Sequence, residues 1–228
     1  MSRGWLVVFA KAPRAGLVKT RMSPPFSLDE CAELYEEILG DVLAATERFA
    51  AGLELEPIIA FYPPDAAQEI VGHAPAGFRL QAQHGSDLGH RMAHAASEAA
   101  AAGVERVLIR GSDSPGLPLA CLEEALARLD AGDDVVLTPD QGGGYALIGL
   151  RTAQPRLFEL EMSTRGLLEQ TLQRARELGL TVSTTKPSFD LDTVGDLQLL
   201  DEISAEVKAD LCPRTVQYLS TSPVDHVL

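Results

Sequence analysis

Residues Trp5-Leu-Val-Val-Phe-Ala10 form a short apolar run that is followed by Lys11 and a Pro- and Gly-containing loop up to Gly16. An uninterrupted apolar run of this length, closed by loop residues, is typical of a strand that is buried on both faces. After the loop, Ser27-Leu-Asp-Glu30 has the spacing of a helix-capping box, and apolar residues then recur every three or four positions through Val42. This strand, loop and helix predict the first unit of a parallel sheet, because parallel strands need a crossover connection.

The rest of the chain continues this alternation. Further strands are predicted at 57–62, 78–82, 104–110, 134–138, 144–150 and 180–185, with helices from about 65, at 88–102, 118–129, 164–178 and 194–207. Strands that alternate with helices predict a three-layer α/β/α fold, in which a mostly parallel sheet lies between two helical layers. Ligands of such sheets bind beyond the carboxyl ends of the strands. The loops after Ala10, Arg110 and Thr138 are therefore the expected location of a functional site.

The domain organisation follows from what the sequence lacks. No internal repeat, low-complexity linker or break in composition divides the 228 residues. We therefore expect a single domain over residues 1–228, with a core at about 5–207 and a C-terminal extension over 208–228. Apolar residues make up 46% of the chain and charged residues 23%, as in ordinary folded globular proteins. The sequence pattern after Pro213 does not distinguish a helix from a strand or a loop.

The charge of the chain limits its partners. Nineteen Lys and Arg against 33 Asp and Glu give a net charge of −14. Such a protein repels the phosphate backbone of nucleic acids and anionic lipid, so we expect neither nucleic acid nor a membrane as a partner. The first 28 residues are the exception, because they contain no acid. Their basic residues are Arg3, Lys11, Arg14, Lys19 and Arg21, and they predict a localised anion site.

The cysteines and the apolar runs bear on the cellular compartment. The three cysteines, Cys31, Cys121 and Cys212, are widely spaced and contain no C-x-x-C pair, so we interpret them as buried thiols in a reducing compartment. The first apolar run is shorter than a secretory signal requires, and no run approaches the length of a membrane span. We expect a cytoplasmic protein. No leftover apolar stripe indicates a partner subunit, and the oligomeric state stays open.

The loop Ala10-Lys-Ala-Pro-Arg-Ala-Gly-Leu-Val-Lys-Thr-Arg21 has the composition of a phosphate-binding loop. Its small residues allow a phosphate to approach backbone N–H groups, while Lys19 and Arg21 supply positive charge. Val18 stands where a Walker A loop has glycine before its lysine, and the single glycine excludes a dinucleotide-binding fingerprint. A solvated basic loop without a ligand is the alternative interpretation.

Five motifs in order resemble those of a known family. They are Phe9–Arg21, Gln83–Met92, Gly111–Pro115, Gly143–Leu150 and Asp190–Thr193. Together they span about residues 5–200 and resemble the bacterial DUF2064 family of glycosyltransferase-like proteins. That family is similar in fold to nucleotide-diphospho-sugar transferases, the glycosyltransferase A fold, and more distantly to guanylyltransferases of molybdenum and deazaflavin cofactor synthesis. The resemblance implies a nucleoside triphosphate or nucleotide sugar, a small acceptor and a divalent cation, Mg²⁺ or Mn²⁺.

The resemblance also implies roles for particular residues. Asp113, directly after a predicted strand, is similar to the metal-binding aspartate of the fold, and Asp192 to its second metal ligand. Two carboxylates suffice for magnesium, because phosphates and water complete its shell. The alternatives are that Asp113 caps a turn and that Asp192 caps the helix after it. Lys19, Arg21 and Asp113 are the expected catalytic residues, and the expected nucleotide-binding residues are Ala10, Lys11, Ala12, Gly16, Lys19, Arg21, Gln83, Asp87 and Arg91.

Two departures from the family pattern bear on activity. The family usually has an acid directly before Gly-Gly-Tyr, where this chain has Gly142, and an aspartate often stands at the position of Gly116. Asp140 is the nearest carboxylate that could substitute. The leading hypothesis is a metal-dependent glycosyl- or nucleotidyltransferase, and the alternative is a nucleotide-binding or partner-binding protein without efficient catalysis. A nicotinamide-dependent dehydrogenase would share the sheet but needs the missing glycine fingerprint.

Overall fold

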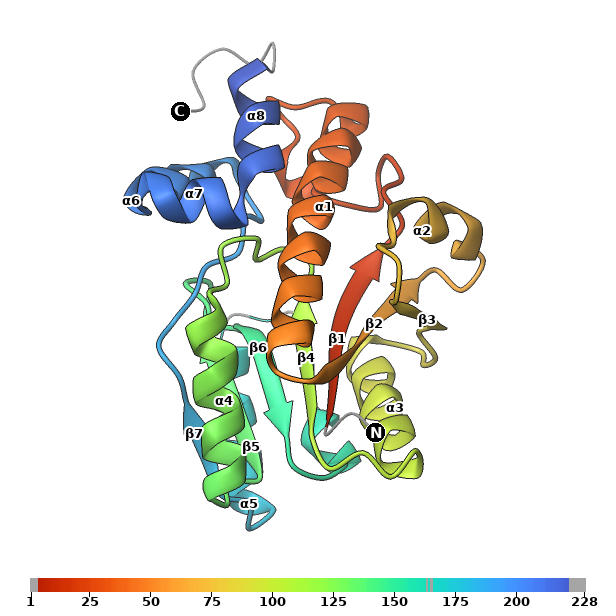
Figure 1. The fold of residues 1–228 in the computed structure, drawn as a ribbon, viewed down its shortest axis with the longest axis vertical. Coiled ribbons are helices and arrows are strands. Elements are labelled where there is room, and N and C mark those ends of the chain that lie inside the picture. Colours follow the sequence, from red (N-terminus) through yellow and green to blue (C-terminus); the bar gives the residue numbers. More distant parts are fainter. Residues whose placement is uncertain (1–3, 163, 165, 222–228) are drawn as a thin grey trace.

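The computed structural model describes residues 4–162, 164 and 166–221, and these contain one seven-stranded sheet (Figure 1). The strand order is β3-β2-β1-β4-β6-β5-β7. The strands are β1 Gly4–Lys11, β2 Leu55–Tyr62, β3 Arg79–Ala82, β4 Val107–Gly111, β5 Val135–Pro139, β6 Tyr145–Leu150 and β7 Val182–Thr184. Neighbouring strands are parallel except at β6, which is antiparallel to both β4 and β5. The expected mostly parallel sheet is confirmed.

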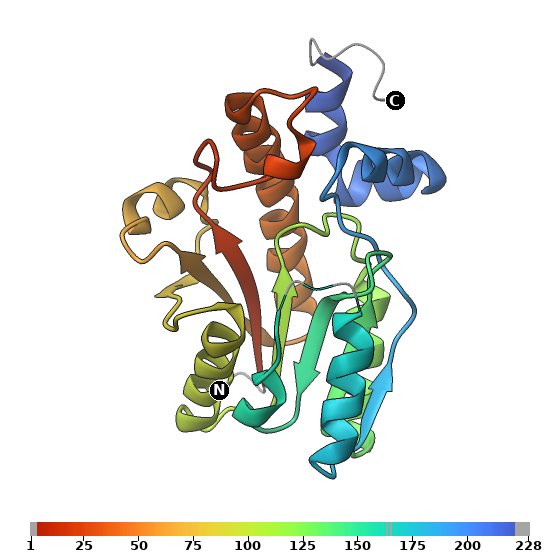
Figure 2. The same cartoon turned by 180° about the vertical axis from the view of Figure 1, so that it is seen from behind.

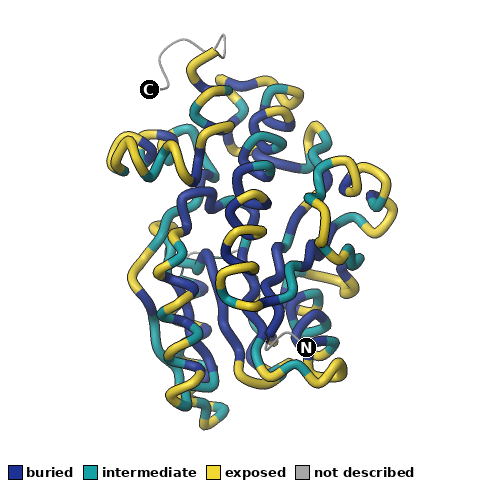
Figure 3. Tube along the Cα trace, viewed as in Figure 1, coloured by how far each residue is buried: buried dark blue, intermediate teal, exposed yellow. Residues whose placement is uncertain are grey.

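Helices cover both faces of this sheet. The α-helices are α1 Leu28–Gly52, α2 Ala67–His73, α3 Leu88–Ala101, α4 Leu119–Ala131, α5 Leu167–Glu177, α6 Leu199–Glu202, α7 Ala205–Leu211 and α8 Pro213–Thr221, and the 3-10 turns are η1 Thr20–Met22, η2 Pro155–Phe158 and η3 Val194–Gln198. Helices α1 and α4 pack on one face, and α3 and α5 on the other, which Figure 2 shows from behind. The central strands β1, β4, β5 and β6 between them are mostly buried (Figure 3). The three-layer arrangement follows from these two apolar cores.

The first unit forms as its sequence pattern predicts. Ser27 caps α1 by accepting a hydrogen bond from the Glu30 backbone N–H, and the Glu30 carboxylate accepts from the Ser27 N–H, which is the capping box. Helix α1 continues ten residues beyond the predicted pattern, to Gly52, and buries one face against β1 and β2. None of the described helices has the length and apolar composition needed to span a membrane.

The prediction of one continuous helix over 194–207 is wrong. The segment consists of the 3-10 turn η3, the short helix α6 and the separate helix α7. The break occurs because Ile203 is extended, with φ −90° and ψ 150°, and Ser204 begins a new helix by accepting a hydrogen bond from the Val207 N–H. The predicted strand over 104–110 also begins later, at Val107, because the Val104 N–H still bonds to the Ala99 carbonyl at the end of α3.

The tail after Pro213 forms α8, which lies against α1 (Figure 1). Asp41 of α1 is buried, and its carboxylate accepts hydrogen bonds from the Arg214 N–H at 3.1 Å and from the Thr215 N–H at 2.8 Å. The Thr215 hydroxyl donates a third bond to it at 2.7 Å. A side chain of one helix therefore satisfies the free N–H groups at the start of another. Residues 222–228 of the predicted C-terminal extension lie outside the described residues.

Asp41→Ala should destabilise the protein by about 2–3 kcal/mol, because it leaves buried N–H donors of α8 without an acceptor. Chemical denaturation followed by circular dichroism measures this free energy of unfolding. Glu37→Ala is the control: Glu37 forms a partly exposed ion pair with Arg214 of the same helix, at 2.7 Å, and its loss should cost at most about 1 kcal/mol. Equal effects of the two substitutions would show that Asp41 does not anchor α8.

Candidate functional site

A cavity of about 480 Å³ lies at the carboxyl ends of β1, β2 and β4, where the sheet topology predicts a ligand site. Most of the predicted site residues line it, namely Ala10, Lys11, Lys19, Arg21, Gln83, Arg91, Asp113 and Asp192. Tyr35, Tyr62, Leu88 and Ser112 also contribute to the wall. The structure thus brings together residues that are up to 182 positions apart in the sequence.

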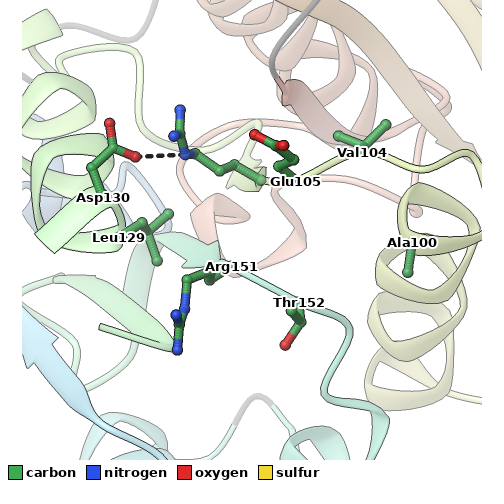
Figure 4. A pocket seen from close by; sticks show the side chains of 8 residues that line it. Ala100, Val104, Glu105, Leu129, Asp130, Arg151 and Thr152 are labelled. Carbon is green, nitrogen blue, oxygen red and sulfur yellow. Dashed lines mark ion pairs between the residues drawn. The ribbon is translucent and has the colours of Figure 1, made fainter. Parts of the chain in front are cut away.

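A second cavity of about 500 Å³ lies near the opposite ends of the strands (Figure 4). Its two arginines are already paired with acids: Arg106 contacts Asp130 at 2.6 Å, and Arg151 contacts Asp134. Because both arginine charges are balanced within the protein, neither arginine indicates an anionic ligand here. The predicted site residues instead line the cavity at the carboxyl ends of the strands.

Lys19 is the centre of that cavity. Its Nζ atom contacts Oδ1 of Asp113 and lies 3.4 Å from Oδ1 of Asp192, and only 2% of its side chain is exposed. Its backbone has φ 48°, in the left-handed region that non-glycine residues rarely adopt. Arg21 approaches from the solvent side, with Nη1 3.8 Å from Oδ2 of Asp192. The first loop and both predicted metal ligands therefore meet in one ion-pair cluster.

The two aspartates come from loops that are tied to each other. The Leu191 N–H donates to the Asp113 carbonyl at 2.9 Å, and the Ser114 hydroxyl donates to Oδ1 of Asp190. Gln141 holds the second loop from the other side, because its amide nitrogen donates to the Asp190 carbonyl at 2.7 Å and its amide oxygen accepts from the Asp190 N–H at 3.0 Å. These bonds fix the distance between Asp113 and Asp192.

Neither aspartate has the capping role that was the alternative to metal binding. Thr193, not Asp192, is the N-cap of η3, and Asp196 completes the capping box by accepting from the Thr193 N–H at 2.6 Å. The Asp192 carboxylate instead contacts Lys19 and Arg21. The Asp113 carboxylate likewise contacts Lys19 rather than a turn N–H among the described residues.

The electrostatics of the cluster follow from burial and charge. Burial lowers the pKa of Lys19, but the charges of Asp113 and Asp192 outweigh this effect and raise its pKa above the ordinary value. Burial and the neighbouring Asp113 charge raise the pKa of Asp190 to about 7, and the same two causes raise the pKa of Asp192. The site thus concentrates negative charge that one internal ammonium only partly neutralises.

Arg110 lies beneath the loop that carries Asp113. Its guanidinium is fully buried, donates to the Ser114 carbonyl at 2.7 Å, and lies 3.3 Å from the Thr46 hydroxyl. Burial lowers the pKa of Arg110 to about 10, which keeps it charged at neutral pH. A buried cation is costly without a partner, and the nearby Asp190 charge partly compensates it. Arg110 therefore supports the Asp113 loop from within the core.

Tyr35 is a site residue that the sequence pattern does not reveal. It belongs to the apolar face of α1, but its hydroxyl accepts a hydrogen bond from the Lys11 N–H at 2.9 Å and lies 2.8 Å from Oγ of Ser112. It therefore connects the first loop to the loop after β4. Helical spacing identifies Tyr35 as buried but cannot show that its hydroxyl ends beneath a cavity.

Of the predicted nucleotide-binding residues after β3, Gln83 and Arg91 line the cavity and Asp87 does not. Gln83 is buried at the cavity wall, where its amide nitrogen donates to the Ala60 carbonyl at 2.7 Å. The Arg91 guanidinium stacks on the Tyr62 ring, 4.5 Å from its centroid. Asp87 lies outside the cavity lining and is the N-cap of α3, accepting from the His90 N–H. That bond and the His90 side chain lower the pKa of Asp87 to about 2.

Some residues of the predicted anion-binding loop also lie outside the cavity lining. Ala12 is buried, and its N–H donates to the Tyr62 carbonyl at 2.7 Å, so it is not free to bind phosphate. Gly16 occupies a turn with φ 79° that a side chain would strain. Arg14 points away and pairs with Glu69 of α2 at 2.5 Å, while Arg3 lies outside the described residues.

The two glycines that depart from the family pattern have different surroundings. A side chain at Gly116 would meet the ring of Phe189, whose nearest atom is 2.6 Å from the position of a Cβ atom. At Gly142 there is more space, and the Asp140 carboxylate bends back to accept hydrogen bonds from the Gly142 N–H at 2.6 Å and the Gly144 N–H at 2.9 Å. Asp140 thus holds the turn between β5 and β6.

Gly116→Asp should lower the free energy of unfolding by about 1–3 kcal/mol, because the Phe189 ring must move out of the core to admit the side chain. Gly142→Asp makes the same chemical change where the nearest atom is 3.3 Å away, so it should be tolerated better. Thermal unfolding of both variants tests this order. The reverse order would mean that Phe189 does not determine the glycine at position 116.

Comparisons with known proteins identify the fold and the family of the chain. The chain is 30% identical to a provisionally assigned nucleotide-diphospho-sugar transferase from Desulfovibrio desulfuricans G20, with a TM-score of 0.81 and coverage of 96% of this chain and 99% of that chain. It also has the fold of the 4-diphosphocytidyl-2C-methyl-D-erythritol synthase from Anaerococcus prevotii DSM 20548, at 10% identity, a TM-score of 0.55 and coverage of 87% and 97%. A CMP:2-keto-3-deoxy-manno-octonic acid synthetase solved with CTP matches at 10% identity, a TM-score of 0.55 and coverage of 90% and 99%. A search of proteins with curated functions gives no match.

The sheet and these similarities define the class, which is the fold of nucleotide-diphospho-sugar transferases and cytidylyltransferases. Within it, the chain belongs to the DUF2064 family, described as uncharacterized proteins conserved in bacteria, which matches residues 46–164. The family and fold expected from the sequence motifs are both confirmed.

Proposed function

We propose that the protein is a metal-dependent transferase that binds a nucleoside triphosphate or nucleotide sugar and transfers a nucleotidyl or glycosyl group to a small acceptor. The observation that carries this proposal is the convergence of Lys19, Asp113 and Asp192 in the cavity at the carboxyl edge of the sheet. The basic loop and two carboxylates are what a polyphosphate and its counter-ion require.

The donor set fits a divalent cation. Asp113 and Asp192 both contact one Nζ atom, so they are close enough to share a cation, and 40% and 47% of their side chains are exposed. The described residues contain no group of three or more His, Cys, Asp or Glu side chains placed to hold a metal. A site with two carboxylates suits Mg²⁺ or Mn²⁺, which take their remaining oxygens from phosphates and water. Bound there, the ion would neutralise charge on the phosphates.

The protein's own groups have distinct tasks in such a reaction. Lys11, Lys19 and Arg21 line the cavity and would bind the phosphates, and Lys19 and Arg21 would stabilise the charge that develops on the leaving group. In nucleotidyl transfer, an acceptor oxygen forms a bond to the α-phosphorus and pyrophosphate leaves. In glycosyl transfer, the acceptor oxygen bonds to the sugar carbon and a nucleoside diphosphate leaves. Gln83 and Arg91 would contact the base and ribose from the wall near Tyr62.

Ligand-induced thermal shifts and product analysis test this proposal. Each nucleoside triphosphate and a panel of nucleotide sugars are added with and without Mg²⁺, and released pyrophosphate or nucleoside diphosphate is measured with sugar and phosphosugar acceptors. We expect at least one nucleotide to raise the melting temperature more strongly with Mg²⁺ than without it. The absence of any nucleotide or metal effect across the panel would overturn the proposal.

A second candidate, nucleotide binding without efficient catalysis, rests on Gly142 and Asp140. The family position before Gly-Gly-Tyr lacks its carboxylate, and the nearest one, Asp140, is engaged with the loop N–H groups. This candidate gives a metal-dependent thermal shift without turnover on any acceptor tested. Turnover that disappears in Asp113→Asn would exclude it.

A further inference from the structure

The Lys19 ammonium contacts one oxygen of each of the two carboxylates that would hold a metal. Its Nζ contacts Oδ1 of Asp113 and lies 3.4 Å from Oδ1 of Asp192, while its side chain is almost completely enclosed. The left-handed backbone at Lys19, with φ 48°, directs the side chain into the cavity and is itself unfavourable for a lysine. The ion pairs therefore hold Lys19 in a position that the chain alone does not favour.

An ammonium in this position opposes metal binding. Two ionised carboxylates carry two negative charges, and Lys19 reduces this to one, so a divalent cation experiences a weaker attraction. A metal that uses both carboxylates must also recover the oxygens that Nζ occupies. Arg21, 3.8 Å from Oδ2 of Asp192, weakens the attraction further. The free protein is therefore poorly prepared to take up a metal ion on its own.

A polyphosphate would reverse this balance. Lysine carries its charge on a flexible four-carbon stem, so Nζ can move several Å without a change in the backbone. Phosphate oxygens in the cavity offer Nζ another anionic partner and supply the metal with further ligands. Both effects free the carboxylates for the metal.

We propose that Lys19 occupies the cation position between Asp113 and Asp192 in the free protein, and that polyphosphate binding draws Lys19 away so that a divalent metal can bind. This inference rests on the proposed function and adds an order to it, in which the phosphates bind before the metal or together with it. Lys19 thereby weakens the binding of a metal in the absence of substrate.

Equilibrium dialysis against Mn²⁺ tests this order. The free Mn²⁺ concentration is the same on both sides of the membrane, so the excess on the protein side is the bound metal. Without phosphate, Lys19→Met should bind Mn²⁺ about tenfold more tightly than the unaltered protein, because one opposing charge is gone. Inorganic pyrophosphate should tighten Mn²⁺ binding to the unaltered protein by a similar factor and affect Lys19→Met much less. The pyrophosphate comparison on the unaltered protein needs no substitution, so it remains available if Lys19→Met folds poorly.

Two further variants complete the design. Lys208→Met makes the same chemical change outside the cavity lining, where the Lys208 Nζ pairs with Asp201 at 3.0 Å. Without phosphate it should bind Mn²⁺ like the unaltered protein, whereas Asp113→Asn should lose the binding. Equal or weaker Mn²⁺ binding by Lys19→Met, or no strengthening by pyrophosphate, would overturn the inference and leave the proposed function standing. Failure of every form to bind Mn²⁺ even with pyrophosphate would overturn both.

Discussion

Asp113→Asn should reduce turnover by roughly 10²–10³-fold and remove the Mg²⁺-dependent part of the nucleotide thermal shift. The amide has nearly the shape of the carboxylate but no charge, so it offers a metal a weaker ligand and leaves Lys19 with Asp192 alone. Because Asp113 also contacts the buried ammonium, some loss of stability without ligand accompanies the functional loss. Steady-state product release and melting curves with and without Mg²⁺ separate the two effects.

Asp130→Asn is the matched control for this prediction. Asp130 lines the cavity at the opposite end of the strands, where it pairs with Arg106 (Figure 4). The same chemical change there should leave turnover and the Mg²⁺-dependent shift intact. If both variants kept full activity, the cluster around Lys19 could not be the active site, and the proposed reaction would need another location on the fold.

The convergence of the first loop with two distant aspartates could be predicted from the sequence. The first loop and Asp113 each follow a predicted strand, and parallel strands present their carboxyl ends at one edge. The topology therefore brings Lys19 and Asp113 together, whereas the position of Asp192 beside them was implied only by the resemblance to a known family. What the sequence could not show is that Lys19 contacts both carboxylates, since this depends on a left-handed backbone conformation at a non-glycine residue.

Asp87 directly precedes the helix predicted at 88–102 and caps α3 through the His90 N–H, so its role is local. Other parts of the site depend on tertiary contacts that no local pattern encodes. The sequence identifies Tyr35 only as a core residue, because its hydroxyl meets Ser112 only after α1 packs on β1 and β2. Arg110 stands within an apolar strand, and its role beneath the Asp113 loop follows from the burial of its guanidinium.

Asp190 adjoins the predicted ligands but acts differently from them. Asp190 and Asp192 lie two positions apart in the sequence, and in an extended segment both side chains would point the same way, but Asp190 accepts a hydrogen bond from Ser114 while Asp192 contacts Lys19. Burial of the Asp190 carboxyl group and the nearby charge of Asp113 raise the pKa of Asp190 to about 7. A carboxyl group that is more easily protonated in the folded than in the unfolded chain stabilises the fold at low pH and loses this contribution as the pH rises.

The stability of the metal-free protein should therefore decline as the pH rises from about 4 to about 7, and Asp190→Asn should remove the part of that decline that Asp190 causes. Raising the pKa of Asp190 from its ordinary value of 3.8 to about 7 corresponds to about 4 kcal/mol of stability that is present below pH 4 and lost above pH 7. Asparagine keeps an oxygen for the Ser114 hydroxyl but does not ionise. Hence at pH 8 Asp190→Asn should be more stable than the unaltered protein, by up to this amount.

Urea unfolding at a series of pH values between 4 and 8, in the presence of EDTA, measures this difference directly. Asp130→Asn retains Asp190 and should show the pH dependence of the unaltered protein, because the Asp130 carboxylate lies partly exposed at the other edge of the sheet. Should Asp190→Asn instead be less stable at pH 8, the ionised Asp190 would be a net stabilising partner of the buried Arg110, and the attraction between these two groups would outweigh the cost of burying the carboxylate.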